Sequence, residues 1–337
     1  MSKFASSLSA ASQNRLPSAG LRRYAVHGIV LEITSPFAAM LVACDQILGY
    51  FTVEDRTFRP TLRLSLIAEF DARPWPDVQS ETWALLGETD WLTCYVCGEQ
   101  YFYQSQDNSQ LLLDLAAGCG CGWIDARASA DAIQRFCQRL WLPALATLLC
   151  TRGLFPLHAA AALHTNGGGA LIVGQSGQGK STLLLHLLQQ GWRYLGDDAV
   201  FIRQTRAAAS ELLACPAQIR ARPEILRFLP ELQPHLTALT PDVDGKYRLN
   251  GWLTARTATP RLILLPEVVA AVQSSVVPVS RAAAAVACFT DNLLVSSHPV
   301  SAAQFALIAQ YIQQAACYAI QLGQDMSRVA HLIQEIW

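Results

Sequence analysis

A run of nine residues near the middle of the chain limits its fold more than any other segment. In order, the run is Gly174, Gln175, Ser176, Gly177, Gln178, Gly179, Lys180, Ser181 and Thr182. It matches G-x-x-x-x-G-K-[ST], a loop whose backbone N–H groups cradle phosphates, because its glycines allow the tight bend that this requires. A short apolar strand expected over residues 170–173 precedes it, and a helix expected over residues 180–190 follows it. We therefore predict an α/β core in which this loop binds the phosphates of a nucleotide.

Two side chains of the loop have specific roles in such a site. Lys180 reaches the β- and γ-phosphates, and the hydroxyl of Ser181 binds Mg²⁺. The loop alone does not distinguish an ATPase, a GTPase or a kinase. The L-S-G-G-Q motif of transporter ATPases and the N-K-x-D motif of GTPases are both absent from the sequence. Many such enzymes hold Mg²⁺ with an acid at the end of a distant apolar strand, but here Pro266 precedes the nearest candidate, Glu267.

A pair of adjacent acids follows the expected helix. Asp197 and Asp198 lie 17 and 18 residues after Lys180, directly after a strand expected over residues 192–196. Neighbouring residues in a strand point to opposite faces, so one carboxylate can face the γ-phosphate while the other supports Mg²⁺. A carboxylate beside the γ-phosphate can accept the proton of an attacking hydroxyl. The alternative is an ordinary pair of acids in a turn between two strands.

The segment around the loop resembles the C-terminal catalytic domain of the HPr kinase/phosphorylase family. The resemblance covers about residues 154–203. It rests on a histidine before a strand, a serine within the loop, a glycine after the helix and the paired acids, which are here His158, Ser176, Gly191, Asp197 and Asp198. It implies a P-loop domain of the HPr-kinase/PEP-carboxykinase type that uses ATP and Mg²⁺.

The resemblance also implies a role for each matching residue. Asp198 is then the proton acceptor, which leaves Asp197 to support Mg²⁺. Lys180 corresponds to the family's phosphate-binding lysine, and Ser181 corresponds to its Mg²⁺ ligand. His158 corresponds to a histidine near the acid. A lone histidine on an apolar strand is otherwise more often a core residue, and that alternative stays open.

Several features depart from the family. Its later E-x-R-G-x-G signature is absent, and the nearest segment, residues 218–224, does not match. Thr182 replaces the family's usual glutamate, which brings the loop closer to HPr-kinase-like relatives that modify peptide precursors or small molecules. The first 150 residues do not resemble the family's N-terminal domain. HPr as the substrate and the reverse, phosphorylase reaction therefore do not follow. Lys246 and Arg248, expected in a polar loop, are weaker candidates for contacting the transferred phosphoryl group.

The composition excludes several other classes of protein. The chain has 337 residues, of which 52% are hydrophobic, and this is too apolar for a disordered protein. Its 25 basic and 26 acidic residues give a net charge of −1, so no overall field attracts nucleic acid. No apolar run reaches the roughly 18 residues of a membrane span, and residues 1–23 lack the apolar region of a secretory signal. We expect a disordered leader over residues 1–23 and a cytoplasmic protein.

Two domains are expected after the leader. Residues 24–151 are predicted to form a smaller α+β domain, rich in mostly antiparallel strands, and residues 152–337 the P-loop domain. A helix is expected to begin at Ser129 or Asp131 and to run to about Thr151, with a kink or a break into two helices at Pro143. The other expected elements are strands over 24–33, 154–163, 199–202, 262–265 and 317–322, and helices over 36–51, 301–316 and 326–336.

Four cysteines of the first domain have the spacing of a zinc site. Cys94 and Cys97 form a C-x2-C pair, and Cys119 and Cys121 form a C-x-C pair. Four thiolates can hold zinc in tetrahedral geometry, although the second pair is tighter than usual. Cysteine is also a small buried hydrophobe, so an ordinary core is the alternative.

Together these observations predict an ATP- and Mg²⁺-dependent phosphotransferase whose acceptor is a hydroxyl, such as a serine of a protein or peptide. The N-terminal domain would then select that acceptor. A nucleotide-binding regulatory or scaffold protein without phosphotransfer is the alternative, since the same loop serves both. The family often forms oligomers, and the high apolar content is compatible with a homo-oligomer.

Overall fold

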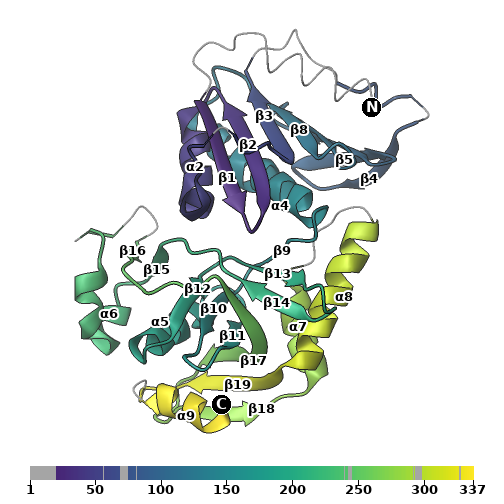
Figure 1. Cartoon of the computed structure of the whole chain (residues 1–337). Coiled ribbons are helices and arrows are strands. Elements are labelled where there is room, and N and C mark those ends of the chain that lie inside the picture. Colours follow the sequence, from purple (N-terminus) through teal and green to yellow (C-terminus); the bar gives the residue numbers. More distant parts are fainter. Residues whose placement is uncertain are drawn as a thin grey trace. The chain divides into compact units, whose positions relative to one another are not determined.

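The structure, a computed structural model, describes residues 20–337 except 56, 69–74, 81, 239, 242–244, 291, 293–297, 326 and 327. The chain divides into two units, Met1–Arg152 and Gly153–Trp337 (Figure 1). Both units combine helices with sheets, so the protein is a mixed α/β structure rich in strands. Among the described residues, every helix is too short or too polar to cross a membrane.

The first unit is built around an eight-stranded sheet. Within the described residues, the strand order is β1-β2-β3-β8-β7-β6-β5-β4. Two pairings, β2 with β3 and β3 with β8, are parallel, and the others are antiparallel. The strands are β1 (Gly20–Val26), β2 (Ile29–Ser35), β3 (Leu62–Ile67), β4 (Ala84–Glu88), β5 (Leu92–Cys97), β6 (Gln100–Ser105), β7 (Gln110–Asp114) and β8 (Cys119–Trp123).

Two expectations for the start of the chain are wrong. The expected leader extends too far, because residues 20–23 belong to β1 and pair with β2; the rest of the leader, residues 1–19, lies outside the described residues. The single strand expected over residues 24–33 is a hairpin. His27 and Gly28 both have positive φ, at 48° and 92°, which is the geometry of a two-residue turn between antiparallel strands.

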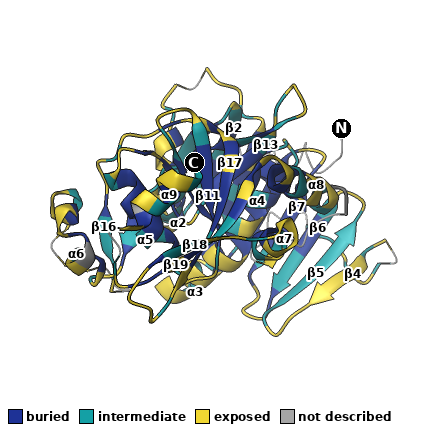
Figure 2. Ribbon diagram, turned by 90° about the horizontal axis from the view of Figure 1, so that it is seen from below, coloured by how far each residue is buried: buried dark blue, intermediate teal, exposed yellow. Residues whose placement is uncertain are grey.

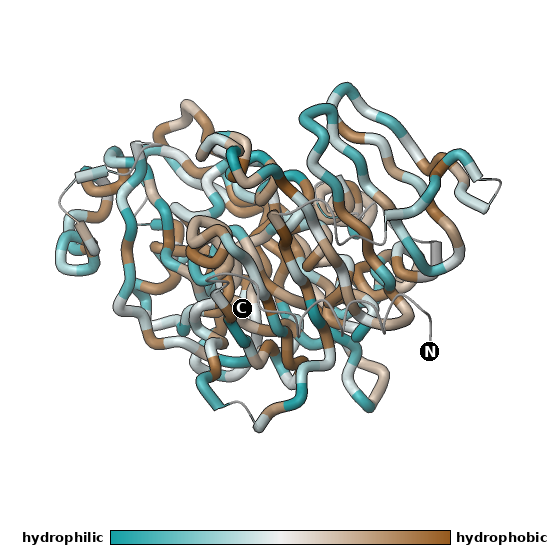
Figure 3. The backbone as a smooth tube through the Cα atoms, turned by 90° about the horizontal axis from the view of Figure 1, so that it is seen from above, coloured by the Kyte–Doolittle hydropathy of each residue, from teal (hydrophilic) through white to brown (hydrophobic). Residues whose placement is uncertain are grey.

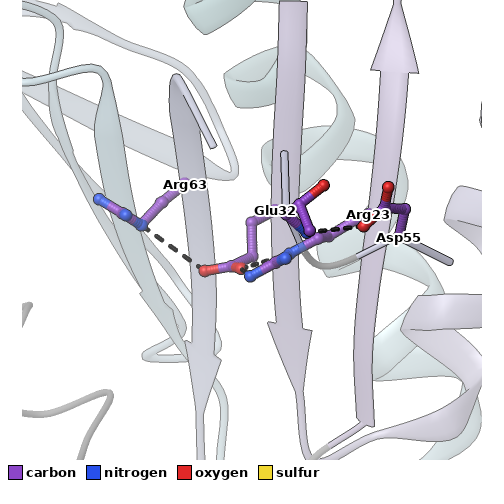
Figure 4. A network of polar contacts seen from close by, with 5 residues as sticks. Arg23, Glu32, Asp55 and Arg63 are labelled. Atoms are coloured by element: carbon purple, nitrogen blue, oxygen red, sulfur yellow. Dashed lines mark hydrogen bonds and ion pairs between the residues drawn. The ribbon is translucent and has the colours of Figure 1, made fainter. Parts of the chain in front are cut away.

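A row of charged side chains crosses the first three strands of this sheet (Figure 4). Glu32 on β2 lies opposite Arg23 on β1 and Arg63 on β3 in the strand register. Its carboxylate forms ion pairs with both, at 2.5 Å to Arg23 and 3.5 Å to Arg63. Cross-strand pairs of opposite charge contribute roughly 0.2–1 kcal/mol each. The row therefore supports the register of β1, β2 and β3.

The helices of the first unit follow the expected pattern. They are α2 (Ala38–Leu48), the 3₁₀ turn η1 (Gly49–Phe51), α3 (Ala130–Phe136), the π-helical segment η2 (Cys137–Trp141) and α4 (Leu142–Cys150). Ser129 caps α3, because its side chain accepts a hydrogen bond from the N–H of Ala132. The helix is not broken at Pro143: α3 continues through the π-helical η2 directly into α4, and the proline lies in the first turn of α4.

The four candidate zinc cysteines do not converge. Cys94 and Cys97 lie on β5, whereas Cys119 and Cys121 lie on β8, and strands β6 and β7 separate the two. At about 4.8 Å per strand, the pairs are roughly 14 Å apart, far beyond a shared ion with Zn–S bonds of about 2.3 Å. Burial raises the pKa of Cys94 and that of Cys119, each to about 11, as expected for thiols packed against apolar neighbours.

The second unit carries its strands in a nine-stranded sheet and a two-stranded one, counted over the described residues. The main path is β12-β10-β11-β17-β14-β13-β9, and β19 joins β17 and β18. The strands are β9 (Phe155–Leu157), β10 (Ala160–Leu163), β11 (Gly168–Ile172), β12 (Arg193–Gly196), β13 (Val200–Gln204), β14 (Ser210–Leu213), β15 (Ile219–Ala221), β16 (Tyr247–Leu249), β17 (Thr257–Val268), β18 (Ser275–Pro278) and β19 (Ala316–Leu322).

One helix packs into the centre of this unit and the others lie around it. They are α5 (Lys180–Gln189), α6 (Ile225–Phe228), the 3₁₀ helix η3 (Pro230–His235), α7 (Arg281–Thr290), α8 (His298–Gln314) and α9 (Val329–Ile336). Buried leucines of α5 share a hydrophobic core with residues of β10, β11 and β17. In Figure 2, β11 is mostly dark blue, whereas β17 combines buried and exposed residues. Figure 3 shows teal, hydrophilic segments in several of the outer loops.

One expectation in this unit needs correction, and one helix was not predicted. The strand expected over residues 154–163 is interrupted at His158 and Ala159, because β9 pairs with β13 whereas β10 pairs with β11 and β12. Helix α7 was not predicted from the sequence. By contrast, the helix, strand and helix expected near the C-terminus are confirmed as α8, β19 and α9, with residues 326 and 327 outside the described part.

Candidate active site around the glycine-rich loop

The glycine-rich loop connects β11 to α5, as the sequence predicts. Gly177 and Gly179 have φ values of 88° and 100°, which other residues adopt only with strain. Gly179 is also crowded, since a Cβ there would lie 2.6 Å from Cδ1 of Leu322. Lys180 is the first residue of α5, so the N-terminus of this ten-residue helix opens directly onto the loop. The backbone therefore has the bend and the orientation that phosphate binding needs.

The polar groups of the loop are bonded to one another. The backbone N–H of Gln175 donates to Oε1 of Gln178 at 2.6 Å. The ammonium group of Lys180 donates to the carbonyl oxygens of Gly174 and Gln175, at 2.6 and 3.3 Å. Lys180 is buried, and only 6% of its surface is exposed. A backbone donor and a cation that suit a phosphate are thus held within the loop itself.

Asp197 lies in the turn between β12 and β13 and faces the start of α5. Its Oδ1 accepts a hydrogen bond from the hydroxyl of Ser181 at 3.1 Å. Its other oxygen, Oδ2, is buried without a partner. Burial and then the neighbouring charge of Asp198 raise the pKa of Asp197 to about 7, although Ser181 and Lys180 act in the opposite direction. A half-satisfied, buried carboxylate beside a serine hydroxyl is a favourable place for a cation with oxygen ligands.

Asp198 differs from Asp197 in its exposure and in its backbone conformation. It is exposed, and its φ of 63° places it in the left-handed region. The two acids do differ in exposure, since Asp197 is buried and Asp198 is exposed, but the expected cause is wrong. Both residues lie outside the strands, so the separation comes from the turn and not from strand alternation. The alternative of turn acids is therefore correct for their location, while Asp197 remains bonded to the loop helix through Ser181.

His158 contacts the main chain of this turn. Its Nδ1 lies 3.0 Å from the carbonyl oxygen of Asp198. A carbonyl oxygen only accepts, so Nδ1 carries the proton in this bond. The backbone N–H of His158 donates to Oδ1 of Asn292, a buried residue 134 positions further along the chain. The sequence indicated a histidine near the acid but gave no signal for Asn292.

The long strand β17 does not supply an acid to the loop. Pro266 and Val268 are the β17 residues nearest to Gly179. Glu267 lies between them, so strand alternation turns it to the opposite face, where it is exposed. The acid that bonds to Ser181 is therefore Asp197, in the turn after β12, and not an acid of β17.

The remaining candidates lie in other parts of the unit. Arg248 is in strand β16 and pairs in register with Arg220 of β15, so the loop expected there is a strand; Lys246 directly precedes it. In the described residues, no group of three or more histidine, cysteine or acidic side chains is arranged to hold a metal ion. A cavity of about 610 Å³ lies near the start of β11 and includes Asn166, Thr259 and Arg261 in its wall. It contains none of the candidate site residues.

The chain was compared with protein families, curated proteins and solved structures. No family model matches the chain, and no curated protein matches it. Among solved structures, the chain is similar to an HPr(Ser) kinase/phosphatase from Coxiella burnetii, at 12% identity, over 54% of this chain and 95% of that one. The TM-score is 0.26, a value too low to establish a shared fold or activity. The assignment of function therefore depends on the geometry of the loop and its neighbouring acids.

Proposed function

We propose that this protein is an ATP- and Mg²⁺-dependent phosphotransferase that transfers the γ-phosphoryl group to a hydroxyl, such as a serine of a protein or peptide. The observation that carries the proposal is the contact between Ser181 and buried Asp197 at the start of α5. It lies beside Lys180 and next in sequence to the exposed acid Asp198. A phosphate loop, an acid for the cation and an acid for a proton are thus carried by two neighbouring turns.

The residues present fit the two groups that the proposal requires. The unpartnered Oδ2 of Asp197 and the hydroxyl of Ser181 are oxygen ligands of the kind that Mg²⁺ prefers. Gly177 and Gly179 keep the loop open to an anion, because neither carries a side chain. When bound, ATP supplies the phosphoryl group and Mg²⁺ supplies positive charge that neutralises the phosphates.

Each residue then has a defined task. Lys180 exchanges its bonds to the loop carbonyls for bonds to phosphate oxygens, which are stronger acceptors because they are charged. Asp197 and Ser181 hold the cation. Asp198, which is exposed, is free of the core and accepts the proton of the attacking hydroxyl. His158 holds the backbone of the turn that carries Asp198.

The test is transfer of label from γ-labelled ATP, with Mg²⁺, to candidate protein or peptide acceptors. Lys180→Ala should abolish nucleotide binding. Asp198→Asn should abolish transfer and leave nucleotide binding largely intact. Asparagine is the right substitute because it tolerates the left-handed conformation at φ 63°, whereas alanine would strain the turn. Asp90→Asn is the matched control, since Asp90 is exposed and lies in the other unit.

Two results would contradict the proposal. Transfer that survives Asp198→Asn would show that the proton acceptor is wrong. Binding of ATP with no labelled acceptor under any condition would leave only a nucleotide-binding protein, with Asp197 reduced to holding Mg²⁺.

A further inference from the structure

The amide of Asn292 links the end of α7 to the candidate active site. Asn292 is buried, with 6% of its surface exposed, and it uses its polar groups in both directions. Its side-chain Nδ2 donates to the backbone carbonyl of Cys288 at 2.8 Å, and its backbone carbonyl accepts from Nε2 of Gln304 at 2.7 Å. Gln304 is completely buried. These bonds fix the asparagine in place and leave its Oδ1 directed at the backbone N–H of His158.

The sheet provides no hydrogen-bond partner for this backbone N–H. His158 lies in the break between β9 and β10, after the last pair of the β9 ladder, Leu157 with Val200. An unpaired backbone N–H that is removed from water destabilises the folded chain. The Oδ1 of Asn292 takes the position of the missing strand partner.

The link continues from His158 to Asp198. The ring Nδ1 of His158 donates to the carbonyl of Asp198, whose backbone is held at φ 63°. A non-glycine residue in this region is strained and keeps the conformation only when its surroundings hold it. One chain of hydrogen bonds therefore runs from α7 through Asn292 and His158 to the turn that bears the proposed proton acceptor.

We infer that Asn292 is a positioning residue for phosphoryl transfer. It touches neither nucleotide nor acceptor. It fixes the backbone of His158 and, through the imidazole, the direction of the Asp198 carboxylate. The inference rests on the proposed function for its catalytic consequence, while the geometry of the hydrogen-bond chain stands independently of it.

The decisive comparison is between Asn292→Ala and Asn292→Asp. Alanine removes the acceptor for the His158 N–H. Aspartate keeps an acceptor oxygen there, replaces the amide that donates to Cys288 and adds a carboxyl group at a buried position. We expect alanine to lower the rate of transfer at least tenfold, with the dissociation constant of ATP changed less than twofold. Aspartate should restore a large part of the loss. Equal effects of the two substitutions, or a transfer rate within twofold of the unmodified chain in Asn292→Ala, would overturn the inference.

A second measurement does not depend on activity. In the unmodified chain, the ¹⁵N spectrum of the His158 ring should show the proton on Nδ1, and the His158 amide should exchange with solvent at least a hundredfold more slowly than in an open peptide. Asn292→Ala should remove the amide protection and weaken the tautomer preference. If the unmodified chain transfers no phosphoryl group but shows both signals, the function is wrong and the positioning is right. An unprotected His158 amide in the unmodified chain overturns the positioning, even if Asn292→Ala fails to fold.

Discussion

Replacing Asp197 by asparagine should change the pH dependence of stability in a defined direction. Burial is the main reason that the pKa of Asp197 is raised from 3.8 to about 7. The folded protein thus holds this proton more tightly than the unfolded chain does. The stabilising effect of the proton is complete below about pH 4 and is lost as the pH rises to about 7. Asparagine cannot ionise, so the variant should not show this loss.

The expected size follows from the same shift. One pKa unit corresponds to about 1.36 kcal/mol, so a shift of about 3 units amounts to about 4 kcal/mol above pH 7. About 2 kcal/mol of this is already lost at pH 5, because the unfolded carboxyl is ionised there. The difference in unfolding free energy between Asp197→Asn and the unmodified chain should therefore widen by about 2–3 kcal/mol from pH 5 to pH 8.

Urea titrations with pulsed deuterium labelling can measure this difference. Labelling read in peptides that cover α5 reports on the second unit alone, which matters because the chain has two units. Asp90→Asn, at an exposed aspartate, should show no such widening. Mg²⁺ at pH 8 should stabilise the unmodified chain but not Asp197→Asn, because a bound cation replaces the lost proton. A difference that stays constant from pH 5 to pH 8 would refute the argument from burial.

Two other predictions concern the loop. Gln178→Ala frees the N–H of Gln175 and should raise the affinity for ATP or pyrophosphate about fivefold in calorimetry, the equivalent of roughly 1 kcal/mol for one hydrogen bond. Gln178→Glu should lower that affinity instead, and an unchanged affinity in both variants would contradict the internal bond. In Gly179→Ala, the added methyl group would lie against Leu322 at a φ of 100°. This variant should lower the unfolding free energy by about 1–3 kcal/mol in the same urea assay. Gly167→Ala is the comparison, because Gly167 has a positive φ of 95° but open space around it.

Elements with strong local signals were predictable from the sequence. The strand, loop and helix around Lys180 could be predicted because the glycine pattern of residues 174–182 is specific to a loop between a strand and a helix. The helix, strand and helix at the C-terminal end follow from apolar spacing. Helix α7 was missed although four consecutive alanines, residues 282–285, favour a helix. His27-Gly28 was likewise a turn signal within an apolar run.

Contacts between distant residues were not predictable. The cysteine spacing suggested one zinc site, but spacing does not reveal that β6 and β7 separate the two pairs. Nothing near Asn292 indicates that it bonds to His158, 134 positions away. The left-handed backbone of Asp198 is also a tertiary result, because the turn must connect β12 to β13 and hold Asp197 against α5.

The burial of Lys180 has a consequence for protein chemistry. The chain contains only three lysines, Lys3, Lys180 and Lys246, so the products of an amine-reactive reagent are easily separated by mass. An ammonium group bonded to two carbonyls must lose those bonds and its proton before it can attack an acylating reagent. Acylation of Lys180 should therefore lag behind that of an ordinary exposed amine. The acylation rate of Lys180 therefore reports on its hydrogen bonds to the two loop carbonyls. A bound polyphosphate would change that rate, because its oxygens would replace the carbonyls as acceptors for this side chain.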